Sequence, residues 1–433
     1  MSRLDESAGG SMKKSAISGF YKKSMEDRLA LVGEYGDLSD EEMRRMGNTG
    51  ALDEALVDRM IENVVGAMPL PLGIAVNFVI NGTEVLVPMA IEEPSVVAAA
   101  SNAAKMARPS GGFQAETTDP VMIGQIQLVE VPDPEGAKAS ILERKEELLE
   151  LCNAKDPVLV KFGGGARDVE VRILDSLTGP MVVVHLLVDC RDAMGANAVN
   201  TMAEAAAPFL EGVTGGRVYL RIISNLAVKR LARAYATFRK EDIGGAEVVE
   251  GIVQAYAFAA ADPYRSATHN KGVMNGIDAV VIATGNDWRA IESGAHAYAA
   301  MDGRYNPLTT WERDANGDLV GHIEVPMAVG LVGGATAVHP TAKANVKLLG
   351  VKTAQELARI IAAVGLAQNF AALRALATEG IQRGHMSLHA RNIAVTVGAN
   401  LDEVDEVVRR LVEEKAVRMD RAEEILKEIR DSS

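Results

Sequence analysis

Hydrophobic residues recur along the chain with helical spacing in some stretches and with alternation in others. At residues 54–68 the apolar positions fall three and four residues apart, which is typical of an amphipathic helix. Residues 74–80 and 84–88 have the composition of strands, and the Asn81-Gly82 pair between them is a strong hairpin signal. Residues 94–106 predict an apolar helix with Pro94 at its first position.

The middle of the chain predicts a compact β-α-β-β-α-β unit. Its strands are expected at residues 123–131, 168–174, 181–189 and 217–223, with helices at residues 134–152 and 193–210. This order of elements is the ferredoxin-like motif. We therefore expect a small domain at residues 119–227, inserted into a large domain that comprises residues 1–118 and 228–378.

Helical patterns dominate the rest of the large domain, at residues 246–261, 288–300, 342–349 and 354–377. A short apolar run at residues 279–283 predicts a strand that ends in Thr284-Gly285-Asn286-Asp287. Residues 379–433 predict short, charged amphipathic helices with little core of their own, which would form a C-terminal flap. The expected fold class is α+β, with a large mixed helical and sheet domain, an inserted ferredoxin-like small domain and this helical flap.

Composition and charge narrow the range of partners. The 433 residues carry a net charge of −14, whereas nucleic-acid binding requires a basic surface, so no nucleic-acid partner is expected. The longest uncharged stretch, residues 63–83, contains Pro69 and Pro71 and is not expected to cross a membrane. The N-terminus has no apolar core before a cleavage site, and Cys152 and Cys190 lack zinc-type neighbours. These features predict a cytoplasmic protein.

Several common nucleotide and hydrolase motifs are missing from the sequence. Residues 163–168 lack the final glycine of G-x-G-x-x-G, and neither a G-x-x-x-x-G-K-[ST] loop nor a G-x-S-x-G turn occurs. An ordinary dinucleotide-binding fold, a P-loop NTPase and an α/β-hydrolase are therefore not expected.

Four polar clusters interrupt the Ala/Val-rich sequence instead. Glu92-Glu93-Pro94-Ser95 precedes an apolar helix, where acids also serve simply to stabilise a helix N-terminus. Residues 262–272 follow a helix and have the composition of a surface loop, and Gly285-Asn286-Asp287-Trp288 puts an acid at the end of a predicted strand. His385 and His389 lie four residues apart, but without the glutamate of H-E-x-x-H no metal site is expected.

In this order and spacing, the clusters resemble class II 3-hydroxy-3-methylglutaryl-coenzyme A (HMG-CoA) reductases from about residue 19 to the C-terminus. The runs that carry the resemblance are Glu62-Asn63-Val64-Val65-Gly66, Glu92-Glu93-Pro94-Ser95-Val96-Val97-Ala98-Ala99-Ala100, Asp192-Ala193-Met194-Gly195-Ala196-Asn197, Thr268-His269-Asn270-Lys271-Gly272, Ala283-Thr284-Gly285-Asn286-Asp287, Gly330-Leu331-Val332-Gly333-Gly334-Ala335-Thr336 and Gly384-His385-Met386. Each run alone is weak, whereas the ordered set is specific.

The resemblance implies an oxidoreductase that reduces HMG-CoA to mevalonate and free coenzyme A in two hydride steps with NAD(H), or the reverse. Lys271 would be the cation beside the carbonyl oxygen, where charge develops at each hydride transfer. Asp287 would hydrogen-bond this lysine and Glu93, and Glu93 would donate a proton to the aldehyde intermediate. His385 would protonate the departing thiolate, for which imidazole is suited near neutral pH.

The same resemblance assigns residues to the substrate and to the cofactor. Arg265 would hold the free carboxylate of HMG, with Ser95, Asn275 and Thr268 as helpers. The segment Asp192-Ala193-Met194-Gly195-Ala196-Asn197 opens a helix whose free N–H groups would receive the cofactor pyrophosphate. Asp156 would accept hydrogen bonds from the adenosine ribose and repel a 2′-phosphate, which favours NADH over NADPH.

The resemblance also implies an assembly. The active site would lie at the interface of a homodimer, the C-terminal flap would close over it, and dimers can join in a higher assembly. Two alternatives remain open on the residues alone: a reductase of another short acyl-CoA, and a coenzyme A or nucleotide-binding protein without catalysis. The sequence does not indicate whether mevalonate is made or consumed.

Overall fold

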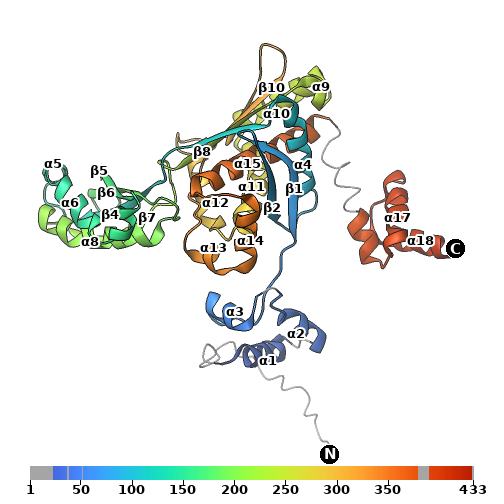
Figure 1. Cartoon of the computed structure of the whole chain (residues 1–433), viewed down its shortest axis with the longest axis horizontal. Coiled ribbons are helices and arrows are strands. Elements are labelled where there is room, and N and C mark those ends of the chain that lie inside the picture. The colour runs from blue at the N-terminus through green and yellow to red at the C-terminus, as the bar shows by residue number, and fades with distance from the viewer. Residues whose placement is uncertain (1–22, 37–38, 51, 379–389, 432–433) are drawn as a thin grey trace, which may run out of the picture. The chain divides into compact units, whose positions relative to one another are not determined.

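The computed structural model describes residues 23–36, 39–50, 52–378 and 390–431 (Figure 1). The chain divides into two compact units, one comprising Met1–Pro71 with His339–Thr341 and the other Leu72–Val338 with Ala342–Ser433. These units follow a different division from the domains expected from the sequence. The domain boundaries near residues 118, 227 and 378 therefore stay predictions.

The described residues of the first unit include the short helices α1 Met25–Gly36, α2 Asp40–Met46 and α3 Glu54–Met60. Asp53 begins α3, because its Oδ1 accepts a hydrogen bond from the Leu56 N–H at 2.8 Å. The helix predicted at residues 54–68 is wrong beyond Met60, since Ile61 is extended and Asn63 has a positive φ of 57°. Apolar residues keep their helical spacing beyond Met60, so the spacing predicted a longer helix than the one observed.

A six-stranded sheet in the order β2-β1-β3-β8-β10-β9 forms the framework of the second unit. Its strands are β1 Leu72–Ile80, β2 Thr83–Ala90, β3 Phe113–Thr117, β8 Leu231–Phe238, β9 Thr309–Arg313 and β10 Leu319–Pro326. The predicted hairpin is confirmed: Ile80 pairs with Thr83 across Asn81 and Gly82, whose φ angles are 50° and 78°. The sequence did not predict β3, β8, β9 and β10, and alanine, which is depleted in strands, occupies every second position through much of β8.

The helices of this framework are α4 Val96–Ala107, α9 Lys240–Ile243, α10 Ala246–Ala261, α11 Pro263–Ala283, α12 Trp288–Ala299, α13 Gly334–Val338, α14 Pro340–Leu349 and α15 Ala354–Ala377, with a 3-10 turn, η2, at Arg108–Ser110. Helix α15 packs against α4, α10, α11 and β8. Its Phe370 stacks on Phe238 of β8 with ring centroids 3.8 Å apart. By length and composition α15 could cross a membrane, but 67% of its apolar window is buried inside the protein, as in a core helix.

Two predicted elements, the strand at residues 279–283 and the start of the helix at Pro94, differ from the structure. The strand expected at residues 279–283 is the last part of α11, because a short apolar run suits a buried helix as well as a buried strand and here both sides are covered. Helix α4 begins at Val96 rather than at Pro94, because Ser95 adopts a left-handed φ of 77°.

A second sheet has the antiparallel order β5-β6-β4-β7. Its strands are β4 Val121–Val129, β5 Gly165–Leu174, β6 Met181–Asp189 and β7 Arg217–Ile223, and its helices are α5 Pro134–Glu143, α6 Lys145–Asn153, α7 Pro157–Lys161 and α8 Ala196–Thr214. Strands and helices follow one another in the predicted order. The helix expected at residues 134–152 is interrupted at Arg144, whose φ and ψ are −97° and 20°, and α8 begins at Ala196 rather than at residue 193.

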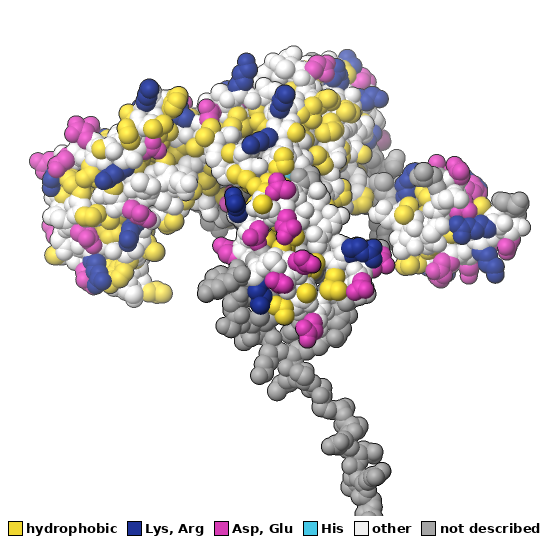
Figure 2. All heavy atoms as spheres, turned by 60° about the horizontal axis from the view of Figure 1, so that its bottom comes forward, with side chains coloured by type: hydrophobic (Ala, Val, Ile, Leu, Met, Phe, Trp, Pro, Cys, Tyr) yellow, Lys and Arg dark blue, Asp and Glu magenta, His cyan; other side chains and the backbone are white. Residues whose placement is uncertain are grey.

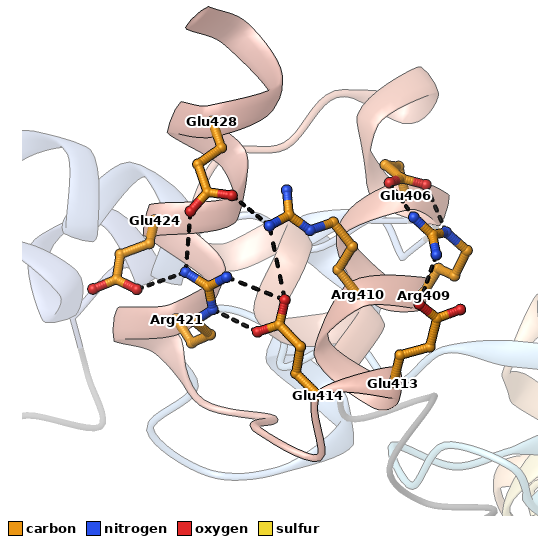
Figure 3. A network of polar contacts seen from close by, with 8 residues as sticks. All are labelled: Glu406, Arg409, Arg410, Glu413, Glu414, Arg421, Glu424 and Glu428. Atoms are coloured by element: carbon orange, nitrogen blue, oxygen red, sulfur yellow. Dashed lines mark hydrogen bonds and ion pairs between the residues drawn. The ribbon is translucent and has the colours of Figure 1, made fainter. Parts of the chain in front are cut away.

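The C-terminal helices form a small bundle from residues 390–396, α17 Leu401–Glu413 and α18 Met419–Asp431. The expectation that they lack a core is wrong, since Val404, Val407 and Leu411 pack with Ile425 and Leu426 in a hydrophobic cluster separate from the main core. Figure 3 shows the ion pairs that join the two helices, in which Arg410 and Arg421 both contact Glu414 and Glu428. The bundle thus has both a hydrophobic core and a charged shell.

Hydrophobic side chains are also exposed on the second unit (Figure 2). On β1 the exposed fractions of Leu72, Ile74 and Val76 are 44%, 39% and 42%, and Leu86 of the neighbouring β2 is 48% exposed. Residues two apart on a strand point to the same side, so the three β1 residues form an apolar row. By contrast, both cysteines are buried, and burial raises the pKa of each thiol to about 12.

Glu403 gives the C-terminal bundle a predicted dependence on pH. The side chain of Arg430, and then the Asn400 N–H, lower the pKa of Glu403 to about 2. A carboxyl group with a lowered pKa stabilises the folded state above its unfolded pKa, and this contribution is lost as the pH falls through the folded value. Hydrogen-exchange mass spectrometry, corrected for intrinsic rates, should therefore show α17 and α18 losing protection between about pH 4.5 and about pH 2.

The matched variant is Glu403→Gln, which removes the charge and keeps the size. It should weaken protection of α17 and α18 already near neutral pH and flatten the acid response. Protection in the unmodified protein that does not change over this pH range would contradict the prediction.

Candidate active site

One face of α11 carries four polar side chains: Arg265, Thr268, Lys271 and Asn275. Their spacing of three, three and four residues aligns them on one side of the helix, over a length of about 15 Å at 1.5 Å per residue. Asp262 begins this helix by accepting a hydrogen bond from the Arg265 N–H at 3.2 Å. The alternative that residues 262–272 form a surface loop is therefore wrong.

Glu93 contacts Lys271 although 178 residues separate the two in the sequence. The Lys271 Nζ lies 2.6 Å from the Glu93 Oε2, and the side chains are 59% and 32% exposed. Glu93 follows β2, against which α11 packs, and this packing brings the pair together. Such an exposed pair contributes little to stability, so its main effect is to orient the two groups.

The start of α4 does not use Glu93 as a cap. Ser95 occupies the cap position with a left-handed backbone, and its side chain makes no capping hydrogen bond. Its hydroxyl is buried and has no partner among the residues that the structure describes. A buried hydroxyl without a partner is costly, which makes Ser95 a candidate contact for a bound polar group beside Glu93.

A buried hydrogen-bond network holds the residues just before Lys271. The His269 Nε2 lies 2.6 Å from the Thr309 hydroxyl, which lies 2.8 Å from the Asn369 Oδ1. Because that amide oxygen can only accept, Thr309 donates to Asn369 and His269 donates to Thr309. Burial, followed by the charge of Arg265, lowers the pKa of His269 to about 3, so this imidazole is neutral.

Asn270, the next residue of the helix, extends the same support. Its Nδ2 donates to the Asn306 carbonyl at 2.9 Å, and its Oδ1 accepts from the Leu308 N–H at 2.9 Å. Both residues that precede Lys271 are therefore anchored to the segment that leads into β9. The sequence showed the run Thr268–Gly272 but could not show which of its members face the core.

Arg265 is a half-buried cation on the polar face. Burial lowers the pKa of its guanidinium, and no acidic side chain among the described residues pairs with it. An unpaired cation that has lost part of its hydration favours an anionic ligand. Asn275 is also half-buried, and Thr268 is exposed and directs its hydroxyl to the Tyr264 carbonyl at 3.5 Å.

Asp287 lies between two helices rather than at a strand end. Its Oδ1 accepts hydrogen bonds from the N–H groups of Arg289 and Ala290 at 3.0 and 3.1 Å and so begins α12. The same oxygen is 3.1 Å from the Arg289 guanidinium. The expected bond from Asp287 to Lys271 does not occur among these contacts, and the second carboxylate oxygen has no partner among the described residues.

The Asp192–Asn197 segment leads into the N-terminus of α8. Gly195 has a φ of 110°, and a Cβ there would lie 2.4 Å from the Cys190 Sγ, so only glycine fits. No side chain caps the start of α8, which leaves its first N–H groups available to an anion. The observed cradle fits the pyrophosphate of a dinucleotide.

Asp156 has a structural task that the sequence did not indicate. Its Oδ1 accepts a hydrogen bond from the Leu159 N–H at 2.9 Å, and Asp156 thereby caps α7. Its negative charge also contributes to the raised pKa of Cys190, after burial, which brings Asp156 into the neighbourhood of the Asp192–Asn197 segment. The carboxylate of Asp156 caps α7 with one oxygen, which leaves its other oxygen for a contact with a ribose hydroxyl.

Two further observations concern residues outside the predicted set or outside the described residues. His385 and His389 lie outside the described residues, and within the described part of the chain no group of three His, Cys, Asp or Glu side chains could hold a metal ion. Sequence reasoning missed Asp278 and Glu292, a partly buried pair in which burial raises the pKa of Asp278 well above its usual range. The only sequence signal was an acid inside the apolar half of α11.

Comparison with known proteins points to one family. Residues 24–390 match a family model described as hydroxymethylglutaryl-coenzyme A reductase. The chain is 62% identical over 416 residues to a 3-hydroxy-3-methylglutaryl-coenzyme A reductase of Archaeoglobus fulgidus, covering 96% of this chain and 95% of that protein. A solved class II reductase of Streptococcus pneumoniae, bound to NADPH in open conformations, matches with a TM-score of 0.75 and 44% identity over 94% of this chain and 100% of that chain.

Proposed function

Because this chain belongs to the hydroxymethylglutaryl-coenzyme A reductase family, we propose that its active site is built on the polar face of α11 and the Glu93–Lys271 pair. The family and the mixed helix and sheet fold predicted from the sequence are confirmed by the matches to the archaeal relative and the class II structure. The protein is an oxidoreductase that acts on HMG-CoA with a nicotinamide cofactor. The assignment of individual residues to this reaction is the proposal.

The observation that carries the proposal is the 2.6 Å contact between Lys271 and Glu93. It joins a cation and a proton-donating acid from distant parts of the chain, on a helix face that also bears the unpaired Arg265. An exposed ion pair alone does not imply catalysis, as Lys229 and Glu170 show, but this pair uses a lysine on the polar face of α11 in a chain of the reductase family. The proposal therefore favours catalysis over simple binding of coenzyme A.

Lys271 is proposed to stabilise the negative charge that develops on the carbonyl oxygen at each reduction. A fixed cation at that point is the largest single catalytic contribution expected for such a reaction. The buried network through His269 and Asn270 supports this role, because it holds the helix backbone that carries the ammonium. Glu93 is proposed to give a proton to the oxygen of the aldehyde intermediate. Its contact with Lys271 supports this role, because it puts the carboxyl group beside the cation that would hold the same oxygen.

Arg265 is proposed to bind the free carboxylate of HMG. Its half-buried guanidinium gains from an anionic partner, and a bidentate contact would orient the substrate along the face of α11. Thr268 and Asn275 lie on the same face, and Ser95 offers its buried hydroxyl beside Glu93. This receptor for a free carboxylate argues against the alternative of a short acyl-CoA that lacks one as substrate.

Asp287 and His385 complete the proposed set. Asp287 holds the start of α12 through one oxygen, and its other oxygen is proposed to hydrogen-bond Lys271 when substrate is bound. His385 is proposed to protonate the thiolate of coenzyme A as the thioester breaks, so that a neutral thiol leaves. His389 is given no part in the chemistry.

The Asp192–Asn197 segment is proposed to hold the nicotinamide cofactor. The uncapped start of α8 and the close approach at Gly195 support binding of the pyrophosphate. When bound, the cofactor supplies the hydride for each reduction. Asp156 is proposed to favour NADH, because a carboxylate accepts hydrogen bonds from ribose hydroxyls and repels a 2′-phosphate. The Streptococcus relative, by contrast, was solved with NADPH bound, the cofactor that Asp156 is proposed to disfavour in this chain.

We further propose a cytoplasmic homodimer with the active site at the interface between its subunits. The apolar row of Leu72, Ile74 and Val76 on β1 supports association, since an exposed apolar strip on a monomer is costly. The C-terminal bundle is proposed to act as a flap that brings His385 to the thioester and excludes water. Its separate core supports movement as one body.

Lys271→Ala should leave the fold intact and lower kcat by roughly 10²–10³ with HMG-CoA and NADH, because a stabilising cation is lost while little packing changes. The measurement is NADH absorbance at saturating substrates, with acetyl-CoA as the control substrate that neither protein should reduce. The matched control is Lys229→Ala, which removes a lysine whose side chain is also exposed and whose 2.8 Å ion pair with Glu170 lies elsewhere. Near-normal turnover by Lys271→Ala would overturn the proposed site.

Asp156 is tested by two variants that separate its charge from its role as a helix cap. Asp156→Asn keeps a capping oxygen and removes the charge, so it should narrow the preference for NADH with little change in stability. Asp156→Ala should narrow the same preference and also cost about 1 kcal/mol of stability. The measurements are kcat/KM for NADH and NADPH, and the denaturation midpoint.

The matched control is Asp133→Ala, because Asp133 caps α5 in the same way, ahead of a proline, with Oδ1 3.0 Å from the Gly136 N–H. It should lose similar stability and leave the cofactor preference unchanged. If the unmodified protein already prefers NADPH, the reading of Asp156 is wrong.

Truncation after Thr378 removes the proposed flap together with His385. The shortened protein should remain folded and dimeric by light scattering and should bind HMG-CoA in calorimetry, yet fail to reduce it. The finer comparison is His385→Gln, which should lose more activity on HMG-CoA than on mevaldehyde, since only the former releases a thiolate. Equal losses on the two substrates would contradict the thiolate role.

A further inference from the structure

The Gly330–Thr336 run has no role in the site as described so far. It lies between the Asp192–Asn197 segment and the loop that ends in Asp287. On one side, the Leu331 N–H donates to the Asp192 carbonyl at 2.8 Å, and Val332 forms a parallel bridge with Ala193. This run is thus in direct contact with the proposed cofactor segment.

On its other side, the same run contacts the catalytic loop. The Gly330 N–H donates to the Asn286 Oδ1 at 2.7 Å, and Asn286 directly precedes Asp287. The Thr336 hydroxyl donates to the Gly285 carbonyl at 3.2 Å. A continuous set of hydrogen bonds therefore connects the proposed cofactor segment to the loop of Asp287.

Arg230 is a buried, positively charged side chain within this connection. It lies directly before β8, is 5% exposed, and donates through Nη1 to the carbonyls of Ala193 and Met194 at 3.0 and 3.1 Å. Its Nη2 donates to the Val329 carbonyl at 2.5 Å. One guanidinium thus joins the cofactor segment to the residue that precedes Gly330.

The partners of Arg230 are unusual for a buried cation. A buried charge is costly unless it is paired, yet the hydrogen bonds of this guanidinium within the described residues go to three main-chain carbonyls, and the carboxylates of Asp189 and Asp192 act on it only through their charge. An apolar side chain would cost less to bury, so stability alone does not account for an arginine here. Its planar fork of donors instead fixes the relative position of two backbone segments.

We propose that Arg230 is a positioning residue that holds the cofactor segment in register with the loop of Asp287. The proposal rests on the assignment of residues 192–197 to the cofactor. Without Arg230 the carbonyls of Ala193 and Met194 lose their anchor, and the cofactor segment shifts relative to the catalytic carboxylate. Displacements of about 1 Å from a distant mutation can cost about 10²-fold in rate.

Gly330 gives a second way to disturb the same contact. A Cβ at Gly330 would lie 2.5 Å from the Met194 N and 3.0 Å from the Ala193 carbonyl carbon. Gly330→Ala therefore pushes the cofactor segment away without removing a buried charge. Arg230→Met removes an anchor of the cofactor segment, and Gly330→Ala adds a steric clash against the same segment.

The test compares Arg230→Met with Arg233→Met in the full-length protein. Arg233 lies on β8, three residues after Arg230, and pairs with Glu324 and Glu116, so its variant also removes an arginine but leaves the connection intact. Arg230→Met should weaken NADH binding, measured by fluorescence titration, by roughly tenfold and lower kcat by roughly 10- to 100-fold. HMG-CoA affinity should stay within about twofold, since the carboxylate receptor on α11 is untouched.

A kinetic isotope effect separates positioning from a general loss of stability. With NADH deuterated at the transferred position, the isotope effect on kcat should rise in Arg230→Met, because hydride transfer becomes slower than product release. It should not rise in Arg233→Met. A lower melting temperature with unchanged NADH affinity and an unchanged isotope effect would overturn the role of Arg230.

Two further variants, Gly330→Ala and Gly195→Ala, distinguish a failure to fold from a failure of the proposal. If Arg230→Met does not fold, Gly330→Ala decides: weaker NADH binding and a raised isotope effect support the proposal, and unchanged values overturn it. Gly195→Ala tests the assignment of the cofactor segment itself. Weakened NADH binding in Gly195→Ala but not in Arg230→Met overturns only the positioning role, whereas unchanged binding in Gly195→Ala overturns the segment assignment.

Discussion

The close packing of α11 on α15 is the constraint from which the rest of the site follows. A Cβ at Gly276 of α11 would lie 2.9 Å from the Gln368 Cβ, and one at Gly365 of α15 would lie 2.8 Å from the Ile277 side chain. The two helices therefore meet where glycines permit it, and one face of α11 is committed to the core. Lys271 lies on the opposite face of α11, away from α15, where its side chain contacts Glu93.

The polar groups of the site fall into two classes with different physical roles. On the buried side of α11, His269 and Asn369 are joined by hydrogen bonds, Asn270 is held by Asn306 and Leu308, and the buried imidazole is kept neutral. In front, the side chains of Lys271 and Glu93 remain exposed. Rigidity thus comes from buried groups, whereas the groups that a reaction needs stay where solvent and substrate reach them.

The sequence predicted the features that depend on neighbouring residues better than those that depend on contacts between distant parts of the chain. The Asn81-Gly82 turn, α10 and α15 were predictable because turn chemistry and long apolar periodicity are local. The end of α11 was mistaken for a strand because a short apolar run has no distinguishing period. The resemblance assigned Glu93 and Lys271 to one site, but their direct contact was not predicted. Arg230 was missed, since main-chain carbonyls leave no trace in the sequence.

Both cysteines are buried, and each thiol has a pKa raised to about 12, so at neutral pH each stays protonated. Thiol–disulfide exchange requires an accessible thiolate, and the chain contains no third cysteine to supply one. Reduction of HMG-CoA releases coenzyme A, itself a thiol that forms disulfides under oxidising conditions. The folded protein is therefore protected from forming a mixed disulfide with its own product, and its activity should not depend on added reductant as long as Cys190 remains packed beneath Gly195.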